Sequence, residues 1–291
     1  MKPSLEGVDL KLARANEHLA FLGAERAALL EANRDAVVRE FDPQRGDHVF
    51  RIAGQRPPLA WGVVVGEFAH ALRSSLDNTI WQLILQRGRH PTDRVQFPIY
   101  KDKANFEGQT NKWGLPRLVD PPDLAFVESA QPYHARGDGP VDKTAIKWHP
   151  LSMLSHLNNV DKHRTIHPAC GAARIVRVDP DGTRRADFIR SDRWKLAAAQ
   201  GRVAAMGLPV PFYRDGTRMC GGFTFAGSDD DPAEIIRVHA TGGSGAQVDV
   251  QPRPTIDVAF SDWELPMDIA DLRDIRDTVV QIVEHFRPAF G

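Results

Sequence analysis

Hydrophobic residues recur at the spacing of an α-helix along two long segments in the first third of the chain. From Ser4 to about Phe41 they fall close to a heptad repeat, and Asp42-Pro43 would end that helix. A second helix is predicted from Trp61 to about Arg87. One face of it carries an apolar stripe made of Trp61, Val65, Phe68, Leu72, Leu76, Thr79 and Leu83.

Helical spacing returns later in the chain. Residues 87–120 have no clear period, and Pro121-Pro122 opens a short predicted helix over Asp123 to Ala130. A longer helix is predicted from about Asp142 to His167, where Pro168 ends it. The last helix spans Asp268 to about Phe286, and its apolar stripe is Leu272, Ile275, Val279, Val283 and Phe286.

Alternating apolar and polar residues predict strands, most of them after Pro168. His48 to Ala53 is a short early strand, and Asp179 to Gly182 is a turn between the two strands of a hairpin. A short alanine-rich helix is predicted over Asp192 to Gly207. The predicted strands after Pro168 are Ala173–Val178, Arg185–Arg190, Gly222–Ala226, Ile235–Ala240, Gln247–Gln251 and Thr255–Phe260.

These elements predict an α+β fold. Three or four long helices from both ends of the chain, residues 1–168 and 266–291, would form a helical bundle. A mostly antiparallel sheet of about five strands, within a β-rich subdomain at residues 169–265, would be inserted before the last helix. Because that helix returns to the bundle, we expect residues 1–291 to form one composite domain.

Composition narrows the class of protein. The chain has 291 residues and a net charge of −1, so no overall basic field would attract nucleic acid or membranes. Its two cysteines, Cys170 and Cys220, form neither a disulfide framework nor a zinc pattern. We expect a cytoplasmic protein with no signal peptide, no membrane span and no cofactor.

Two of the predicted helices carry a cluster of charged residues. On the helix that contains Leu157, Asp161 and Arg164 fall within about 40° of Leu157, where a core residue is due. On the second helix, His70, Arg73 and Asp77 lie nearly in line opposite the apolar stripe. Because a buried charge without a partner is costly, we predict that Arg73 pairs with Asp161 and that Asp77 pairs with Arg164.

The same residues allow two functional interpretations. In the first, the charges form a buried latch that sets the register of the two helices in a non-catalytic binding or structural protein. In the second, they form a catalytic site of His70, Arg73, Asp77, Asn158, Asp161, His163 and Arg164. A histidine would act there as acid or base and an arginine would hold phosphate, which suits metal-free cleavage of a phosphodiester. A metal site, using His163 and His167 four residues apart, is the weaker interpretation.

Two segments carry a resemblance to known proteins. His70 to Asp77, HALRSSLD, and Leu157 to Arg164, LNNVDKHR, resemble the H-x-L-R-x-x-L-D and N-x-x-D-K-H-R helices of a group of uncharacterised bacterial proteins. The helical core, over roughly residues 60 to 168, is reminiscent of the HEPN superfamily. The resemblance implies a metal-independent ribonuclease that acts as a dimer. In HEPN ribonucleases an arginine is followed by a histidine after four to six intervening residues, and no pair in this chain has that spacing.

The resemblance and the helices also suggest partners. RNA is the candidate ligand under the ribonuclease interpretation. The first and last long helices offer more apolar edge than a small bundle usually covers, so we predict a homodimer that forms through helices.

Overall fold

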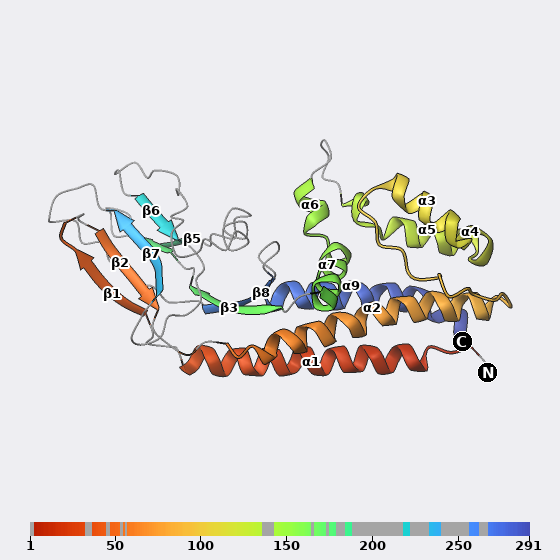
Figure 1. The fold of residues 1–291 in the computed structure, drawn as a ribbon, viewed down its shortest axis with the longest axis horizontal. Helices are drawn as coiled ribbons and strands as arrows, with labels where there is room; N and C mark the ends of the chain where they lie inside the picture. Colours follow the sequence, from red (N-terminus) through yellow and green to blue (C-terminus); the bar gives the residue numbers. More distant parts are fainter. Residues whose placement is uncertain are drawn as a thin grey trace. The chain divides into compact units, whose positions relative to one another are not determined.

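Figure 1 shows a computed structural model of the chain. It describes residues 3–32, 37–44, 47–52, 55, 57–135, 143–163, 166–172, 175–178, 184–187, 218–221, 233–239, 256–261 and 267–291. Contacts divide the chain into two compact units, and each is described by itself. The first unit comprises Met1–Phe21, Val63–Thr165 and Ala270–Gly291, and the second comprises Leu22–Gly62 and Ile166–Ile269.

Three long helices contribute residues to the first unit: α1 (Glu6–Ala32), α2 (Ala60–Gln86) and α9 (Ile269–Phe286). Lys11 of α1 donates to Ser74 of α2, and the later residue His18 lies 3.4 Å from the earlier residue Glu67. These contacts make α1 and α2 antiparallel. The α9 end of the chain lies along α1 in the same way, since Arg276 bonds Asn16 and Arg287 bonds Asp9.

The apolar stripes predicted for α2 and α9 form the core. All seven predicted residues of the α2 stripe are buried, from Trp61 to Leu83, and Thr79 satisfies its hydroxyl on the Ser75 carbonyl. All five predicted residues of the α9 stripe are buried as well, from Leu272 to Phe286. Segments from both ends of the chain thus belong to the first unit.

The prediction of an irregular segment at residues 87–120 is wrong. Two helices lie there, α3 (Lys103–Trp113) and α4 (Leu115–Leu118), followed by α5 (Pro121–Ser129) and a 3-10 turn at Pro132–His134. The α3 sequence buries few side chains, which hid its period, but its ends carry clear signals. Asp102 caps the first turn through the Asn105 N–H, and Gly114 ends the helix at φ 75°, a conformation that favours glycine.

The single helix predicted from about Asp142 to His167 is divided. It forms α6 (Lys143–Lys147) and α7 (Pro150–His163), because the proline lacks an N–H and suits only the first turn of a helix. His149 caps α7, with its Nδ1 accepting the Leu151 N–H at 3.2 Å. This nitrogen accepts only while the imidazole is neutral, and burial lowers the pKa of His149.

The first helix is shorter than its heptad pattern predicted. Helix α1 ends at Ala32, and the chain forms a strand, β1 (Val37–Asp42), where the helix was expected to continue. β1 pairs antiparallel with β2 (Asp47–Ile52), with Asp42 opposite Asp47. The adjacent β-branched residues Val37 and Val38 favour a strand. Ala36 and Val37 had extended the heptad count by coincidence.

The predicted five-stranded sheet is not formed, so the α+β fold class is wrong and the described chain is mostly helical. The later strands pair as β2–β7–β6, β3–β8 and β4–β5, with no set of five. The predictions over 192–207, 222–226 and 247–251 lie outside the described residues. The later strands are β3 (His167–Ala172), β4 (Ile175–Val178), β5 (Arg184–Asp187), β6 (Arg218–Gly221), β7 (Ala233–His239) and β8 (Ile256–Ser261).

The physical reason for this error lies in the order and length of the strands. β7 pairs with β2, which precedes α2, so the strands do not form a sheet from one inserted segment. The strands after α7 contain four to seven residues and pair in separate sets, whereas α2 and α9 carry long apolar stripes.

Gly62 at the start of α2 permits a close approach of the main chain. A Cβ built on this glycine would collide with the carbonyl oxygen of Ile166, which is itself buried. By contrast, a Cβ built on Gly23 in α1 would meet no atom within 4 Å.

We therefore predict opposite effects for two glycine substitutions. Gly62→Ala should lower the free energy of unfolding, because overpacking of this kind costs about 1–3 kcal/mol. That cost exceeds the gain of roughly 0.5–1 kcal/mol from placing alanine in a helix. Gly23→Ala should show the gain alone. Urea denaturation measures both, and stabilisation by Gly62→Ala would contradict the close approach.

A second prediction concerns the His149 cap. The pKa of His149 is lowered in the folded protein. As the pH falls below about 6.5, the histidine is therefore protonated in the unfolded chain before it is protonated in the folded protein. The cap therefore contributes stability above that pH and loses it as the pH falls through the folded pKa. Asparagine is a good cap that does not titrate. The unfolding free energy of wild type relative to His149→Asn should decrease between pH 7.5 and pH 5.5, and a constant difference would refute the cap.

Candidate functional site

The best-defined polar arrangement in the first unit joins α2 to the segment that follows it. Arg73 Nη2 donates to the Phe97 carbonyl at 2.7 Å, and the Phe97 N–H donates to Asp77 Oδ1 at 2.8 Å. The two side chains also form an ion pair at 2.9 Å, one helical turn apart. We call this arrangement the Phe97 clamp. It satisfies both polar groups of a fully buried residue that belongs to no helix or strand.

A buried glutamine holds the far end of the same segment. Gln131 follows α5, and its Nε2 donates to the carbonyls of Pro98 and Val127. Its Oε1 accepts the Tyr100 N–H at 2.9 Å. The stretch from Phe97 to Tyr100 is therefore bound at both ends by side chains in place of a neighbouring strand.

The clamp stabilises a charge that burial disfavours. Burial raises the pKa of the Asp77 carboxyl above its ordinary value. The Arg73 guanidinium, the Phe97 N–H and the more distant Lys162 each act in the opposite direction. Because these partners compensate only in part, Asp77 depends on them, and losing Arg73 would leave a half-buried carboxylate.

The predicted pair of Arg73 with Asp161 is wrong. Arg73 bonds Asp77 of its own helix together with Phe97 and Gln96. Asp161 is exposed, with its carboxylate against Gly66 of α2. The other predicted pair, Asp77 with Arg164, stays a prediction because Arg164 lies outside the described residues. The predicted helix continued to His167, whereas α7 ends at His163 and its last three residues are exposed.

The remaining predicted site residues have differing environments. Asn158 is buried, whereas His70 and His163 are exposed. In the part of the chain that the structure describes, no three His, Cys, Asp or Glu residues form a group that could hold a metal ion. Of the seven predicted residues, the structure brings Arg73 and Asp77 into direct contact.

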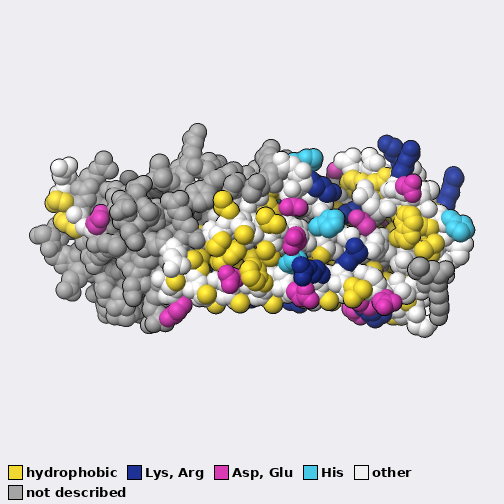
Figure 2. All heavy atoms as spheres, turned by 60° about the horizontal axis from the view of Figure 1, so that its bottom comes forward, with side chains coloured by type: hydrophobic (Ala, Val, Ile, Leu, Met, Phe, Trp, Pro, Cys, Tyr) yellow, Lys and Arg dark blue, Asp and Glu magenta, His cyan; other side chains and the backbone are white. Residues whose placement is uncertain are grey.

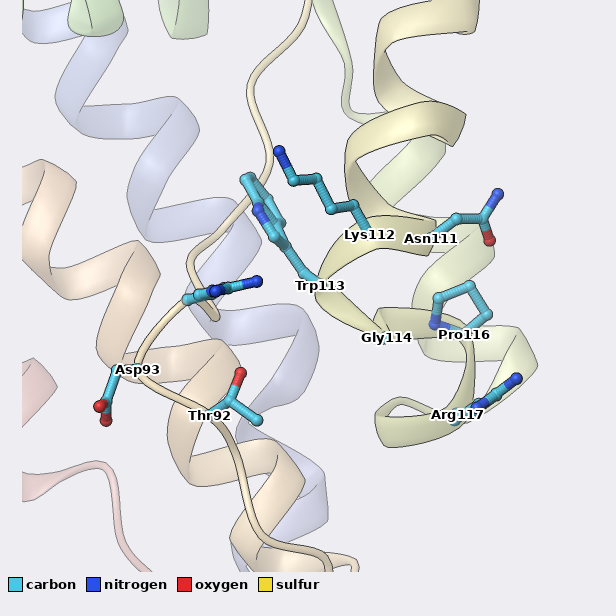
Figure 3. Close-up of a pocket in the computed structure, with 9 residues that line it drawn as sticks. Thr92, Asp93, Asn111, Lys112, Trp113, Gly114, Pro116 and Arg117 are labelled. Atoms are coloured by element: carbon cyan, nitrogen blue, oxygen red, sulfur yellow. The ribbon is translucent and has the colours of Figure 1, made fainter.

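The sequence analysis missed a cavity of about 610 Å³ in the first unit. One wall is the loop after α2, and the other is the turn between α3 and α4 (Figure 3). We call it the cationic cavity, because its lining includes three basic side chains and a tryptophan. The lining residues used below are Thr92, Arg94, Asn111, Lys112, Trp113 and Arg117.

The signals for this cavity were present but separated in the sequence. Lys112 and Trp113 precede Gly114, which ends α3, and Arg94 comes 18 residues before Lys112. Only the helix ends at Asp102 and Gly114 could have shown that this segment is folded. Nothing in the local pattern showed that Arg94 would face the same space.

The chain was also compared with protein-family models, curated proteins and solved structures, and none of them matches. The resemblance to HEPN proteins therefore stays a prediction. Among the described helices, none combines the length and apolar character needed to cross a membrane.

The Phe97 clamp predicts a specific pattern of stability. Asp77→Ala removes the acceptor of the buried Phe97 N–H and should lower the unfolding free energy by about 1–3 kcal/mol. Asp77→Asn keeps an oxygen there and should cost less. Because Arg73 and Asp77 share one partner, the double alanine variant should lose less than the sum of the single losses. Urea denaturation measures this cycle, and simple additivity would show that the two side chains act independently.

Proposed function

We propose that the protein is a non-catalytic binding protein in which the Arg73–Asp77 pair is structural. The observation that supports this most directly is the use of both side chains by one residue, Phe97, whose main chain they bond on both sides. This is a form of the latch interpretation, with one difference. The pair fixes the segment after α2 against that helix instead of setting the register of two helices.

A ribonuclease would need different properties at this pair. An arginine that holds a phosphate must present free donors to a substrate. Arg73 is half-buried, and its Nη2 is already shared among Phe97, Gln96 and Asp77. The Arg73 guanidinium is thus bonded to groups within the fold, which favours a structural role over catalysis.

The surface chemistry is also unlike that of a protein for long nucleic acids. On the face drawn in Figure 2, Lys and Arg side chains are interspersed with Asp and Glu. The net charge of −1 agrees with this mixture. RNA binding depends largely on several phosphate contacts along a basic surface. Local cationic sites, such as the cationic cavity, suit a small ligand better.

The ribonuclease hypothesis remains the second candidate, because His70 and His163 are exposed and open to a substrate. It depends on His163 as acid or base and on an arginine nearby, for which the sequence offers Arg164. The homodimer also stays a prediction, and two exposed apolar residues of α1, Leu10 and Phe21, are compatible with a contact there.

One experiment separates the two candidates. Labelled single-stranded RNA is incubated in EDTA with wild type, His163→Ala and a matched variant, His90→Ala, which alters another exposed histidine. We expect all three to show the same background cleavage, because the proposed function involves no reaction. Cleavage by wild type and His90→Ala that is lost in His163→Ala, with melting temperatures unchanged, would overturn the proposal.

A further inference from the structure

We infer that the cationic cavity binds a nucleotide, with its phosphates on the basic side chains and its base against Trp113. This inference rests on the proposed binding function and names its class of ligand. The cavity volume of about 610 Å³ lies within the usual range for small-molecule sites.

The charges of the cavity are available to a ligand. Neighbouring basic residues of the same region are neutralised within the fold, since Arg87 and Arg89 pair with Asp120 and Arg87 also pairs with Asp123. Within the described residues, Arg94, Lys112 and Arg117 have no ion pair of this kind. Asp93 is the acidic lining residue, and Figure 3 shows its carboxylate directed away from Lys112 and Trp113. The cavity is therefore electropositive in a chain whose net charge is −1.

An aromatic ring lies beside these charges. Trp113 is half-buried, and its ring lies 6.2 Å from that of Tyr100 at an angle of 43°. Figure 3 shows the Trp113 and Lys112 side chains extending to the same side of α3. Any nucleobase can stack on an exposed aromatic face. The Trp113 ring, with cationic side chains beside it, therefore suits a ligand that joins a base to phosphate groups. Thr92 and Asn111 add hydrogen-bonding groups to the lining.

The walls of the cavity are held before any ligand binds. Arg89, just before the loop wall, bonds both the Leu118 carbonyl at the end of α4 and the carboxylate of Asp120. The Phe97 clamp and Gln131 fix the segment that ends at Tyr100, whose ring supports Trp113. A site with fixed walls loses little entropy on binding, so modest contacts suffice for a measurable affinity.

The test uses the full chain and three probes without divalent cations: ATP, sodium tripolyphosphate and adenosine. Isothermal titration calorimetry should show ATP binding more tightly than tripolyphosphate and adenosine binding least. Arg94→Gln and Lys112→Gln should each weaken ATP about tenfold. Arg273→Gln removes an exposed charge from α9, outside the cavity, and should change the affinity less than twofold.

Trp113→Leu tests the ring separately. It should weaken ATP at least fivefold while tripolyphosphate binding stays the same, and that retained binding also shows that the site is folded. Equal losses in Arg94→Gln and Arg273→Gln, or no ATP binding at millimolar concentration, would overturn the site. Tripolyphosphate bound as tightly as ATP would overturn the nucleotide assignment.

The same titrations distinguish this inference from the proposed function. Samples are analysed for ADP and inorganic phosphate after each titration, and again after addition of magnesium. Binding without hydrolysis supports both the site and the non-catalytic function. Hydrolysis that Lys112→Gln abolishes would keep the nucleotide site and overturn the non-catalytic function.

Discussion

A buried main chain without a neighbouring strand needs hydrogen-bond partners. At Phe97, in the first unit, side chains of α2 supply them. Phe97 is fully buried outside any helix or strand, so its N–H and carbonyl cannot be satisfied by regular pairing. Arg73 and Asp77, one turn apart, take the place of a strand edge. A neutral pair could form the same bonds, but charged groups form stronger ones and neutralise each other.

This constraint determines the positions of the residues that follow. With Phe97 fixed on α2 and Tyr100 fixed by Gln131, the chain enters α3 in a defined place. Tyr100 then supports Trp113 at the other end of that helix. The Phe97 clamp on α2 thus helps to fix the geometry of the cationic cavity, whose residues lie on both sides of Phe97 in the chain.

Sequence reasoning succeeded where burial follows a local period and failed where it does not. The stripes of α2 and α9 could be predicted because each helix turn repeats the same demand for an apolar residue. The end of α1 could not be predicted, because Val37 fits the heptad pattern and yet pairs with β2 as part of a strand. The helical wheel assigned Asp161 to the core, but this residue lies in the last turn of α7 and is exposed.

The sequence by itself determined which faces of α2 and α9 are apolar and that Arg73 and Asp77 lie one turn apart on α2, because both follow from spacing along one helix. Only the tertiary structure decided which groups Arg73 and Asp77 bond. Arg73 and Asp77 bond a main-chain amide and carbonyl, groups that nearly every residue carries and that no pattern of side chains reveals. The cationic cavity is of the same kind, since Arg94 and Lys112 share it through the folding of two segments with no common period.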